Sequence, residues 1–595
     1  MIKLFTYGIG NESIKCIRGN QSRVLNSLEK AAMKHKHIHL TAAKNDDTAF
    51  QVFIDADEDF ILSLTNNTVF HPQIELPIIR MEVISCQSNV IECNTWIEGF
   101  IEDDDRCLKA DLLLHDEFIL VSRNTCQPVW VEVKVPTDQD LVRIDGEVIF
   151  YAHRLFEDEQ AVGRLSFSID VLNVIMPQPR DFNFYLDLWQ HPSNISRTHA
   201  VPLWSDEHFA VLESYLNSLA EIGQKVITLI VSEVPWAGQF CFDVKSHLSN
   251  LFEYSIIPVE KDEFGMLMLD FSIMDRYVQT CFSLGIDKEI EIIGLVNIWC
   301  REGTGFEALA ADYPDAIRIR YYDQKDKKYK YCCEGKEIIQ YIHLLETHLI
   351  EKGWIDIVRI MADEPSDIDK YRLSLNAVKE IAPGFKFKAA INHTSFIEEF
   401  RDDITDFVMI TGSLLEEWKI YSQMKSDGAG RYLWYTCCGI SPDSCIRAPL
   451  LESRFIGWLT AYLGLEGFLR WNYTVWPDNP VQSIYWNAPT FPAGENCFVY
   501  PGNNGRPILS IRYMHLRRGI RDFEIIQMMR KNYPDQKEVL ESVFRNIVKV
   551  DDITKSNLGG GKELKADIGA IFSLSYEEYE ASKKELLSAL AMLQN

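Results

Sequence analysis

The sequence predicts an α/β protein: a (β/α)₈ barrel of the TIM type that follows an N-terminal antiparallel β-sandwich. Up to about residue 178, short segments alternate apolar and polar residues between turns, which is typical of a sandwich. After that point, apolar segments alternate with amphipathic ones of helical spacing, which is typical of parallel strands covered by helices. We expect the sandwich at 1–178, the barrel at 179–531, and a mainly helical segment at 532–595 that packs on the barrel.

Eight apolar segments are the predicted strands of the barrel, and helix-forming sequence follows most of them. These segments lie around residues 183–189, 226–231, 290–299, 355–362, 387–392, 406–410, 431–436 and 467–472. The stretch 510–531 is expected to be the eighth helix. In the N-terminal part, residues 21–36 are the main stretch with helical periodicity.

Composition narrows the class of protein. The chain has 595 residues, and 60 Lys and Arg stand against 87 Asp and Glu, which gives a net charge of −27. That charge repels phosphate backbones, so we expect no nucleic-acid partner. No apolar run approaches the ~18 residues of a membrane span, and the N-terminus lacks the apolar core of a signal peptide. We therefore expect a cytoplasmic protein without membrane insertion; the oligomeric state is not predicted.

The 14 cysteines show no C-x-x-C pair and no framework spacing, although Cys332 and Cys333 are neighbours, as are Cys437 and Cys438. We interpret them as reduced and mostly buried thiols, in agreement with a cytoplasmic location.

Two adjacent carboxylates end the fourth predicted strand. The segment IVRIMADEP runs from apolar residues into Asp363, Glu364 and Pro365. Capping of the next helix would need only Ser366 or Asp367. A P-loop ATPase would also place carboxylates after an apolar strand, but the chain has no G-x-x-x-x-G-K-[ST] loop. Because catalytic groups of such barrels lie at the carboxyl ends of the strands, we interpret the pair as catalytic.

Other predicted strand ends carry aromatic rings, amides and histidines. Indole rings stack on the apolar faces of pyranoses, whose hydroxyl groups need directional hydrogen bonds. Any single Trp is more often a core residue, but the repetition at several strand ends favours a carbohydrate-binding cleft. The residues concerned are Trp189, His191, Asn297, Trp299, Asn392, His393, Trp434, Tyr435, Arg470, Trp471, Asn472 and Trp476.

Several of these motifs together resemble glycoside hydrolase family 123: Asp363-Glu364-Pro365, LDLWQHP, LWYTCC, GFLRWNYTVW, CFVYPG and RRGIRDFEII. The resemblance implies a β-N-acetylgalactosaminidase that removes terminal β-linked N-acetylgalactosamine from oligosaccharides, including glycosphingolipid glycans. It also implies a retaining mechanism in which the 2-acetamido group of the substrate is the nucleophile and an oxazolinium ion is the intermediate. Such a reaction needs no metal and no organic cofactor.

The resemblance also implies roles for single residues. Asp363 would orient the acetamido N–H and stabilise the developing positive charge. Glu364 would protonate the leaving oxygen and then deprotonate water, with a pKa raised by desolvation and by Asp363. From its place at a strand end and the needs of the mechanism, Tyr435 is the candidate donor to the acetamido carbonyl, with Trp434 or Trp471 beside the methyl group; the opposite parity of the strand would favour Trp434 instead.

Discrimination of galactosamine from glucosamine needs a polar group at the axial O4. The candidates are Asn392, His393, Arg470 and Asn472, whereas Trp189 and His191 at the first strand end are further candidates for sugar contacts. The linkage that the enzyme prefers is not predicted.

Two other functional hypotheses remain open. Glu416 and Glu417 follow the sixth strand and would be the route to a glycosidase with two separate catalytic carboxylates. Alternatively, the barrel binds carbohydrate without cleaving it, and replacement of Glu364 separates this hypothesis from the enzymatic ones.

Two polar motifs are interpreted as surface features. His35, His37 and His39 alternate and would share one face of a strand, but a metal site there would lack a clear fourth ligand. The acidic run at 102–106 lacks the spacing of an EF-hand, so an acidic turn is favoured over a calcium site.

Overall fold

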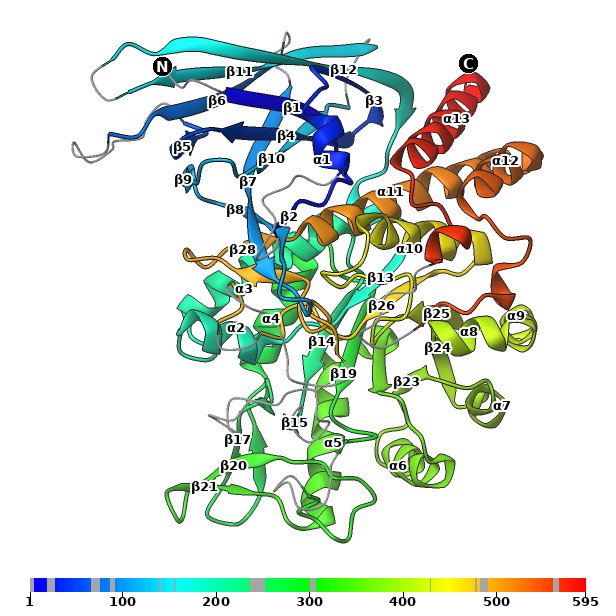
Figure 1. Ribbon diagram of the computed structural model, residues 1–595. Helices are drawn as coiled ribbons and strands as arrows, with labels where there is room; N and C mark the ends of the chain where they lie inside the picture. The colour runs from blue at the N-terminus through cyan, green and yellow to red at the C-terminus, as the bar shows by residue number, and fades with distance from the viewer. Residues whose placement is uncertain are drawn as a thin grey trace.

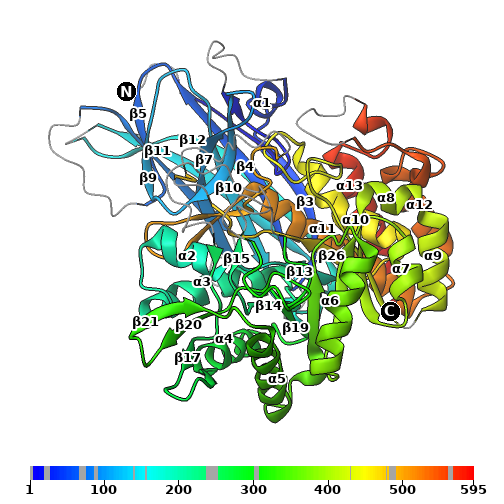
Figure 2. The same ribbon diagram turned by 90° about the horizontal axis from the view of Figure 1, so that it is seen from below.

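The computed structural model describes residues 5–18, 27–65, 75–85, 91–137, 141–154, 157–235, 252–299, 307–428, 430–476, 479–481, 491–559 and 567–594. Within these ranges, two stacked sheets form the N-terminal part, and a ring of parallel strands surrounded by helices forms the larger remainder (Figures 1 and 2). The C-terminal helices lie beside both parts in Figure 1.

The N-terminal part contains two six-stranded sheets, with orders β1-β4-β10-β7-β8-β2 and β3-β12-β11-β6-β5-β9. Their strands are β1 (Phe5–Asn11), β2 (Ile17–Arg18), β3 (His37–Lys44), β4 (Asp46–Ala56), β5 (Phe60–Ser63), β6 (Ile78–Ser85), β7 (Glu92–Glu102), β8 (Leu108–Leu114), β9 (Phe118–Val121), β10 (Gln127–Val135), β11 (Arg143–His153) and β12 (Gln160–Ile175). The predicted sandwich is confirmed, but it is not purely antiparallel, because β12 pairs with β3 and β5 pairs with β6 in parallel. Alternation of apolar and polar residues is the same for both directions, so the sequence pattern did not reveal these pairs.

The only described helix of the sandwich region, α1 (Ser27–Ala32), lies within the stretch predicted to be helical. The first six residues of that stretch, 21–26, fall outside the described residues.

The barrel strands coincide with the eight predicted segments. They are β13 (Tyr185–Leu188), β14 (Val226–Ile230), β19 (Glu289–Ile293), β22 (Val358–Ala362), β23 (Lys386–Ile391), β24 (Ile404–Ile410), β25 (Arg431–Tyr435) and β26 (Gly467–Arg470). All pairs in the order β13-β26-β25-β24-β23-β22-β19-β14 are parallel. A bridge between Leu186 and Gln224 brings β13 beside the start of β14, so the sheet is nearly closed.

Helices cover the outside of the ring. The longer ones are α3 (Asp206–Ile222), α4 (Ser272–Ser283), α5 (Gly335–Glu351), α6 (Ile368–Ile381), α10 (Leu450–Leu463) and α11 (Ile511–Asn532), the last of which lies at the position predicted for the eighth helix. Others are α2 (Pro192–His199), α7 (Ser395–Phe400), α8 (Thr411–Glu416) and α9 (Trp418–Asp427). Local signals set their ends: Ser205 caps α3 by accepting a hydrogen bond from His208 N, and Gly223 ends it with a left-handed φ of 89°.

A small sheet was not predicted from the sequence. It has the order β18-β17-β20-β21 and is built from β17 (Val259–Lys261), β18 (Leu267–Leu269), β20 (Arg320–Asp323) and β21 (Lys328–Tyr331). Its strands belong to the connections that follow the second and third barrel strands, and the sheet lies at the periphery of the molecule in Figure 1.

A layer of charged side chains fills part of the barrel interior. Lys388 on β23 is fully buried, and its Nζ lies 2.9 Å from Glu289 Oε1, 2.6 Å from Glu291 Oε2 and in contact with Asp187. Burial raises the pKa of Glu291 well above its usual range. Burial also acts to raise the pKa of Glu289, but Lys388 and Arg431 hold it below its usual value. These charged side chains form a layer inside the barrel, below the side chains at the carboxyl ends of the strands.

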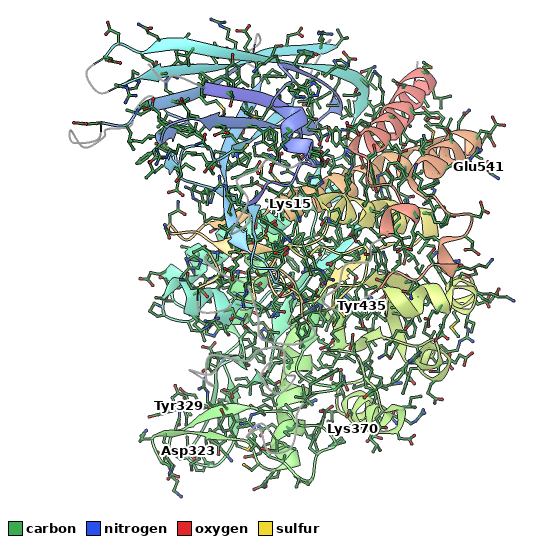
Figure 3. The ribbon with its side chains drawn as sticks, viewed as in Figure 1. Lys15, Asp323, Tyr329, Lys370, Tyr435 and Glu541 are labelled. Carbon is green, nitrogen blue, oxygen red and sulfur yellow. The ribbon has the colours of Figure 1, made fainter. Side chains whose placement is uncertain are left out.

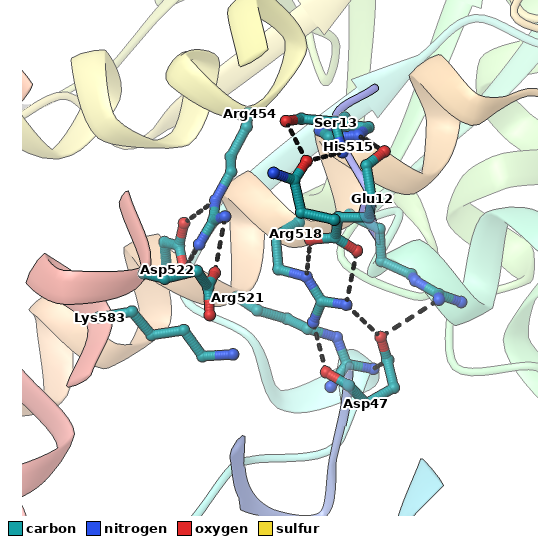
Figure 4. A network of polar contacts seen from close by, with 12 residues as sticks. Glu12, Ser13, Asp47, Arg454, His515, Arg518, Arg521, Asp522 and Lys583 are labelled. Atoms are coloured by element: carbon teal, nitrogen blue, oxygen red, sulfur yellow. Dashed lines mark hydrogen bonds and ion pairs between the residues drawn. The ribbon is translucent and has the colours of Figure 1, made fainter. Parts of the chain in front are cut away.

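Buried arginines of α11 join the barrel to the sandwich. Arg518 Nε lies 3.1 Å from Glu12 Oε1, and its Nη2 lies 3.1 Å from Asp47 Oδ1. Arg521 Nη2 lies 2.7 Å from the other oxygen of Asp47, as Figure 4 shows. Because an unpaired buried charge is costly, each of these groups depends on its partner across the junction.

The β7–β8 hairpin forms a second junction. Its turn contains the acidic run 102–106, in which Asp103 pairs with Lys109 and Asp104 Oδ2 accepts a hydrogen bond from Ala493 N at 2.8 Å. The predicted acidic turn is therefore confirmed, and it contacts a loop of the barrel. Farther along β8, the carboxylate of Asp111 accepts a hydrogen bond from Arg512 Nε at 3.0 Å.

The segment after the barrel contains the helices α12 (Lys537–Ile547) and α13 (Tyr576–Gln594). Helix α13 contacts α11 and also strands β12 and β3, so this segment packs on the sandwich as well as on the barrel. In the described ranges, no helix combines the length and the apolar character that a membrane span requires.

Helices α10 and α11 approach each other closely at two glycines. A Cβ atom on Gly457 would lie 1.9 Å from Gly519 O, and one on Gly519 would lie 2.3 Å from Arg454 O. We predict that Gly519→Ala lowers the free energy of unfolding by about 1–3 kcal/mol or more, because backbone must move to admit the methyl group. Urea unfolding measures this change.

Gly412→Ala in α8 is the matched control, because a Cβ atom there would meet nothing within 4 Å. Equal unfolding free energies for the two variants would contradict the close approach.

Candidate active site

A pocket opens at the carboxyl ends of the barrel strands, where the sequence predicted the catalytic groups. Its volume is about 600 Å³ including the open mouth, within the range of small-molecule sites. Six residues predicted at strand ends line it: Trp189, Trp299, Asp363, Glu364, Tyr435 and Trp471. Its other walls are Ala390, Cys437, Cys438, Leu469 and Phe491. Figure 3 shows Tyr435 near the middle of the molecule, within the barrel.

The backbone at the acidic pair is held in an unusual conformation. Glu364 has a left-handed φ of 44°, which costs about 1–2 kcal/mol for a residue with a Cβ atom. Side chains of consecutive extended residues point in opposite directions, and the left-handed residue breaks this alternation. As a result, both Asp363 and Glu364 line the same pocket.

Three hydrogen bonds fix this conformation. Asn297 Nδ2 donates to the backbone carbonyl of Asp363, and Trp299 Nε1 donates to the same oxygen at 2.7 Å. Glu364 N donates to Ala390 O at 3.1 Å. The cap of helix α6 is Asp367, whose side chain accepts a hydrogen bond from Lys370 N, so the acidic pair is not needed for capping.

The phenol of Tyr435 donates a hydrogen bond to Glu364 Oε1. Burial raises the pKa of Glu364, and the hydrogen bond from Tyr435 opposes that rise. Burial and the Glu364 carboxylate together raise the pKa of Tyr435 well above its usual range, so the phenol keeps its proton. The site thus holds a carboxyl group that favours its acid form beside a fixed donor.

The sequence of the chain matches the family described as "Glycoside hydrolase 123, catalytic domain" over residues 189–529, and this range contains the whole pocket. The chain belongs to glycoside hydrolase family 123. No curated protein matches it by sequence. Among solved structures, a family 123 glycoside hydrolase from Clostridium perfringens, studied for glycolipid glycan hydrolysis, is similar with a TM-score of 0.73, 18% identity and coverage of 99% of each chain.

Other solved glycosidases are much less similar to this family 123 chain. An α-amylase from Lactobacillus plantarum has a TM-score of 0.28 and 12% identity, over 59% of this chain and 80% of its own. A putative β-galactosidase from Bacteroides fragilis has a TM-score of 0.29 and 8% identity, over 85% of this chain and 60% of its own.

One predicted sugar contact lies on the wrong side of the strand. Trp434 is fully buried outside the barrel, where Nε1 donates to Thr460 Oγ1 of α10 at 2.8 Å and the ring packs edge-on against Phe468. Because neighbouring residues of a strand face opposite sides, Tyr435 points into the pocket and Trp434 points toward the helices.

The residues predicted to recognise O4 do not line the pocket. Arg470 is buried, with Nη1 donating to Ser444 Oγ at 2.5 Å and Nη2 to the carbonyls of Gly494 and Glu495. Asn472 is also fully buried. The side chain of His393 is 65% exposed, and Asn392 is partly exposed. These positions lie at or just after strand ends, but their side chains point away from the pocket or lie outside it.

His191 is likewise buried and does not line the pocket. It occupies the cap position of α2, and burial lowers its pKa to about 3, so the ring is neutral.

The carboxylates after the sixth strand have other partners. Glu417 Oε2 accepts a hydrogen bond from Thr394 N at 2.6 Å, and Oε1 lies 3.1 Å from His393 Nδ1. Glu416 is exposed. Neither residue lines the pocket, in which Asp363 and Glu364 are the carboxylates among the described residues.

The described residues offer few places for a metal. His37 and His39 lie on the surface strand β3 with Ser166, Ser168 and Asp170 as partners, in agreement with the predicted surface role. The carboxylates around Lys388 already hold its ammonium group.

A second acidic group lies behind the pocket. It comprises Asp443, Cys445 and Glu495. Arg447 donates a hydrogen bond to Asp443, and Cys445 Sγ lies 3.2 Å from Glu495 Oε2. Glu495 Oε1 also accepts a hydrogen bond from Trp471 Nε1 at 3.2 Å and so fixes one wall of the pocket.

Some lining residues escaped the sequence analysis. Ala390 and Leu469 carry no polar side chain. Phe491 lies in a loop that is far in the sequence from the barrel strands. Cys437 and Cys438 were recognised as neighbours but were not placed in the site, although the strand that precedes them had been predicted.

Proposed function

We propose that this family 123 glycosidase removes terminal, non-reducing β-linked N-acetylgalactosamine from oligosaccharides and glycolipid glycans. The single observation that carries the proposal is a pair of adjacent carboxylates, Asp363 and Glu364, that share one pocket with indole rings. The similar Clostridium perfringens enzyme, which is associated with glycolipid glycan hydrolysis, supports the substrate class.

The adjacent carboxylates favour a substrate-assisted mechanism. In a two-carboxylate glycosidase the groups flank the scissile bond from opposite sides, whereas here both come from the end of one strand. The carbonyl oxygen of the 2-acetamido group attacks the anomeric carbon from the face opposite the leaving group. Asp363 accepts a hydrogen bond from the acetamido N–H and stabilises the oxazolinium ion that forms.

Glu364 carries the protons in both steps. Its acid form donates a proton to the glycosidic oxygen as the bond to the anomeric carbon breaks. The carboxylate then takes a proton from the water that opens the oxazolinium ring on the face from which the aglycone left. Two inversions give a product with retained configuration. The raised pKa of Glu364 supports the first step, since it shifts the equilibrium toward the acid form.

In the free enzyme, the hydroxyl group of Tyr435 is hydrogen-bonded to Glu364, so it is not available as the predicted donor to the acetamido carbonyl of the substrate. A phenol has one O–H, and that of Tyr435 is directed to Glu364 Oε1. The ring of Trp189 also lines the pocket, whereas its Nε1 is buried and has no acceptor among the described residues. Trp471, held by Glu495, is a platform on which an apolar face of the sugar can stack.

The first test replaces the proposed acid. We predict that Glu364→Gln lowers kcat for an aryl β-N-acetylgalactosaminide by about 10²–10⁴-fold, because the amide cannot donate or accept the catalytic proton. Binding of free N-acetylgalactosamine should persist, and the gluco epimer should be cleaved more slowly than the galacto substrate by the intact enzyme. Initial rates and calorimetric titration measure these effects.

Glu417→Gln is the matched control, because that carboxylate lies between α8 and α9, outside the pocket. Loss of activity in Glu417→Gln with retention in Glu364→Gln would favour the two-carboxylate alternative. Sugar binding without turnover by the intact protein would favour the non-catalytic one.

A second test uses the pH dependence. The hydrogen bond from Tyr435 stabilises the ionised form of Glu364 and lowers its pKa, so Tyr435→Phe should raise that pKa. Because the first step needs the acid form, the alkaline limb of kcat/KM should move to higher pH. An alkaline limb that stays in place or moves downward would show that another group is the acid.

A further inference from the structure

Two cysteines in the wall of the pocket have no part in the proposed reaction. Cys437 and Cys438 follow β25 closely, and both are free thiols that are partly exposed. Both residues line the cavity that also contains Glu364 and Tyr435.

The backbone explains how two consecutive residues reach one cavity. Cys438 has a left-handed φ of 55° and is followed by Gly439 with a φ of 70°. In an extended chain, neighbouring side chains would point to opposite sides, so one thiol would face away from the pocket. The left-handed residue removes this alternation at a cost of about 1–2 kcal/mol. Asp363 and Glu364 share the pocket because Glu364 has the same left-handed backbone conformation.

Other neighbouring thiols do not offer this arrangement. Cys332 is fully buried, while the adjacent Cys333 is exposed. Cys16 lies beside Cys126, but both are in the core. Among the cysteines that the structure describes, Cys437 and Cys438 are therefore the pair that opens to a cavity.

We propose that Cys437 and Cys438 form a vicinal dithiol site that binds trivalent arsenicals in the wall of the pocket. The reaction with phenylarsine oxide is a condensation. The arsenic–oxygen double bond breaks, two arsenic–sulfur bonds form, and the oxygen leaves as one water with both thiol protons. Arsenic remains trivalent, so the step needs no oxidant and no reductant.

Because the thiol of Cys437 is protonated, we expect it to react with arsenicals but only poorly with simple alkylating reagents. Contact with the Cys438 thiol, together with burial, raises the pKa of Cys437 well above its usual range. A protonated thiol is a poor nucleophile toward iodoacetamide. In the condensation with an arsenical, both protons leave with the product water, and the chelate holds the arsenic through two sulfur atoms.

The test is titration of the full chain with phenylarsine oxide, followed by intact-mass measurement and pocket tryptophan fluorescence. We expect an adduct at 437–438 that dithiothreitol removes and 2-mercaptoethanol does not. Cys437→Ala and Cys438→Ala should each bind the arsenical about 10²–10⁴-fold more weakly, because one of the two linked contacts is lost. None of these readouts requires turnover, so they remain valid if the proposed substrate is wrong.

Cys333→Ala is the control, since that exposed thiol lies outside the pocket and should leave the adduct unchanged. Peptic mapping of the intact protein locates the arsenic without any variant, which covers the case in which a substitution prevents folding. An adduct on other cysteines, or one that 2-mercaptoethanol removes as readily as dithiothreitol does, would overturn the proposal.

Discussion

The ammonium group of Lys388 at the centre of the barrel is the interaction on which the pocket most depends. It meets the buried carboxylates of Asp187 and Glu291 from two other strands. Ala390 comes two residues after Lys388, Trp189 comes two residues after Asp187, and both line the pocket. Because side chains two residues apart share a face of a strand, the register that brings these charges together also sets the floor of the pocket. Loss of one partner would leave a charge uncompensated in the core.

The sandwich reaches the pocket through a chain of buried contacts. Asp111 of the sandwich binds Arg512, and Arg512 and Arg470 both donate to the carbonyl of residue 494. The next residue, Glu495, accepts a hydrogen bond from Trp471 in the pocket wall. This sequence of contacts gives the sandwich a structural part in the site, and the buried arginines of α11 hold the two units together.

Much of the fold follows from patterns that the sequence displays directly. Apolar runs and helical spacing predicted every barrel strand, and the place of Asp363 and Glu364 at a strand end predicted the pocket. Such patterns do not show which side of a strand a given side chain faces, or where a left-handed residue changes that direction. The left-handed residue at Glu364, the inward position of Cys438 and the outward position of Trp434 depend on local backbone angles and strand parity. Arg470 was misjudged because a loop distant in sequence supplies its hydrogen-bond acceptors.

In the proposed mechanism, the acetamido group of the substrate is the nucleophile, assisted by Asp363 and Glu364. The most direct measurement is kcat/KM for aryl β-galactosaminides whose N-acetyl group carries zero, one, two or three fluorine atoms. Fluorine withdraws electron density from the carbonyl oxygen, so the account predicts a steep fall with each substitution. Rates that are indifferent to fluorine would contradict it, because an enzyme nucleophile would then have to attack the anomeric carbon.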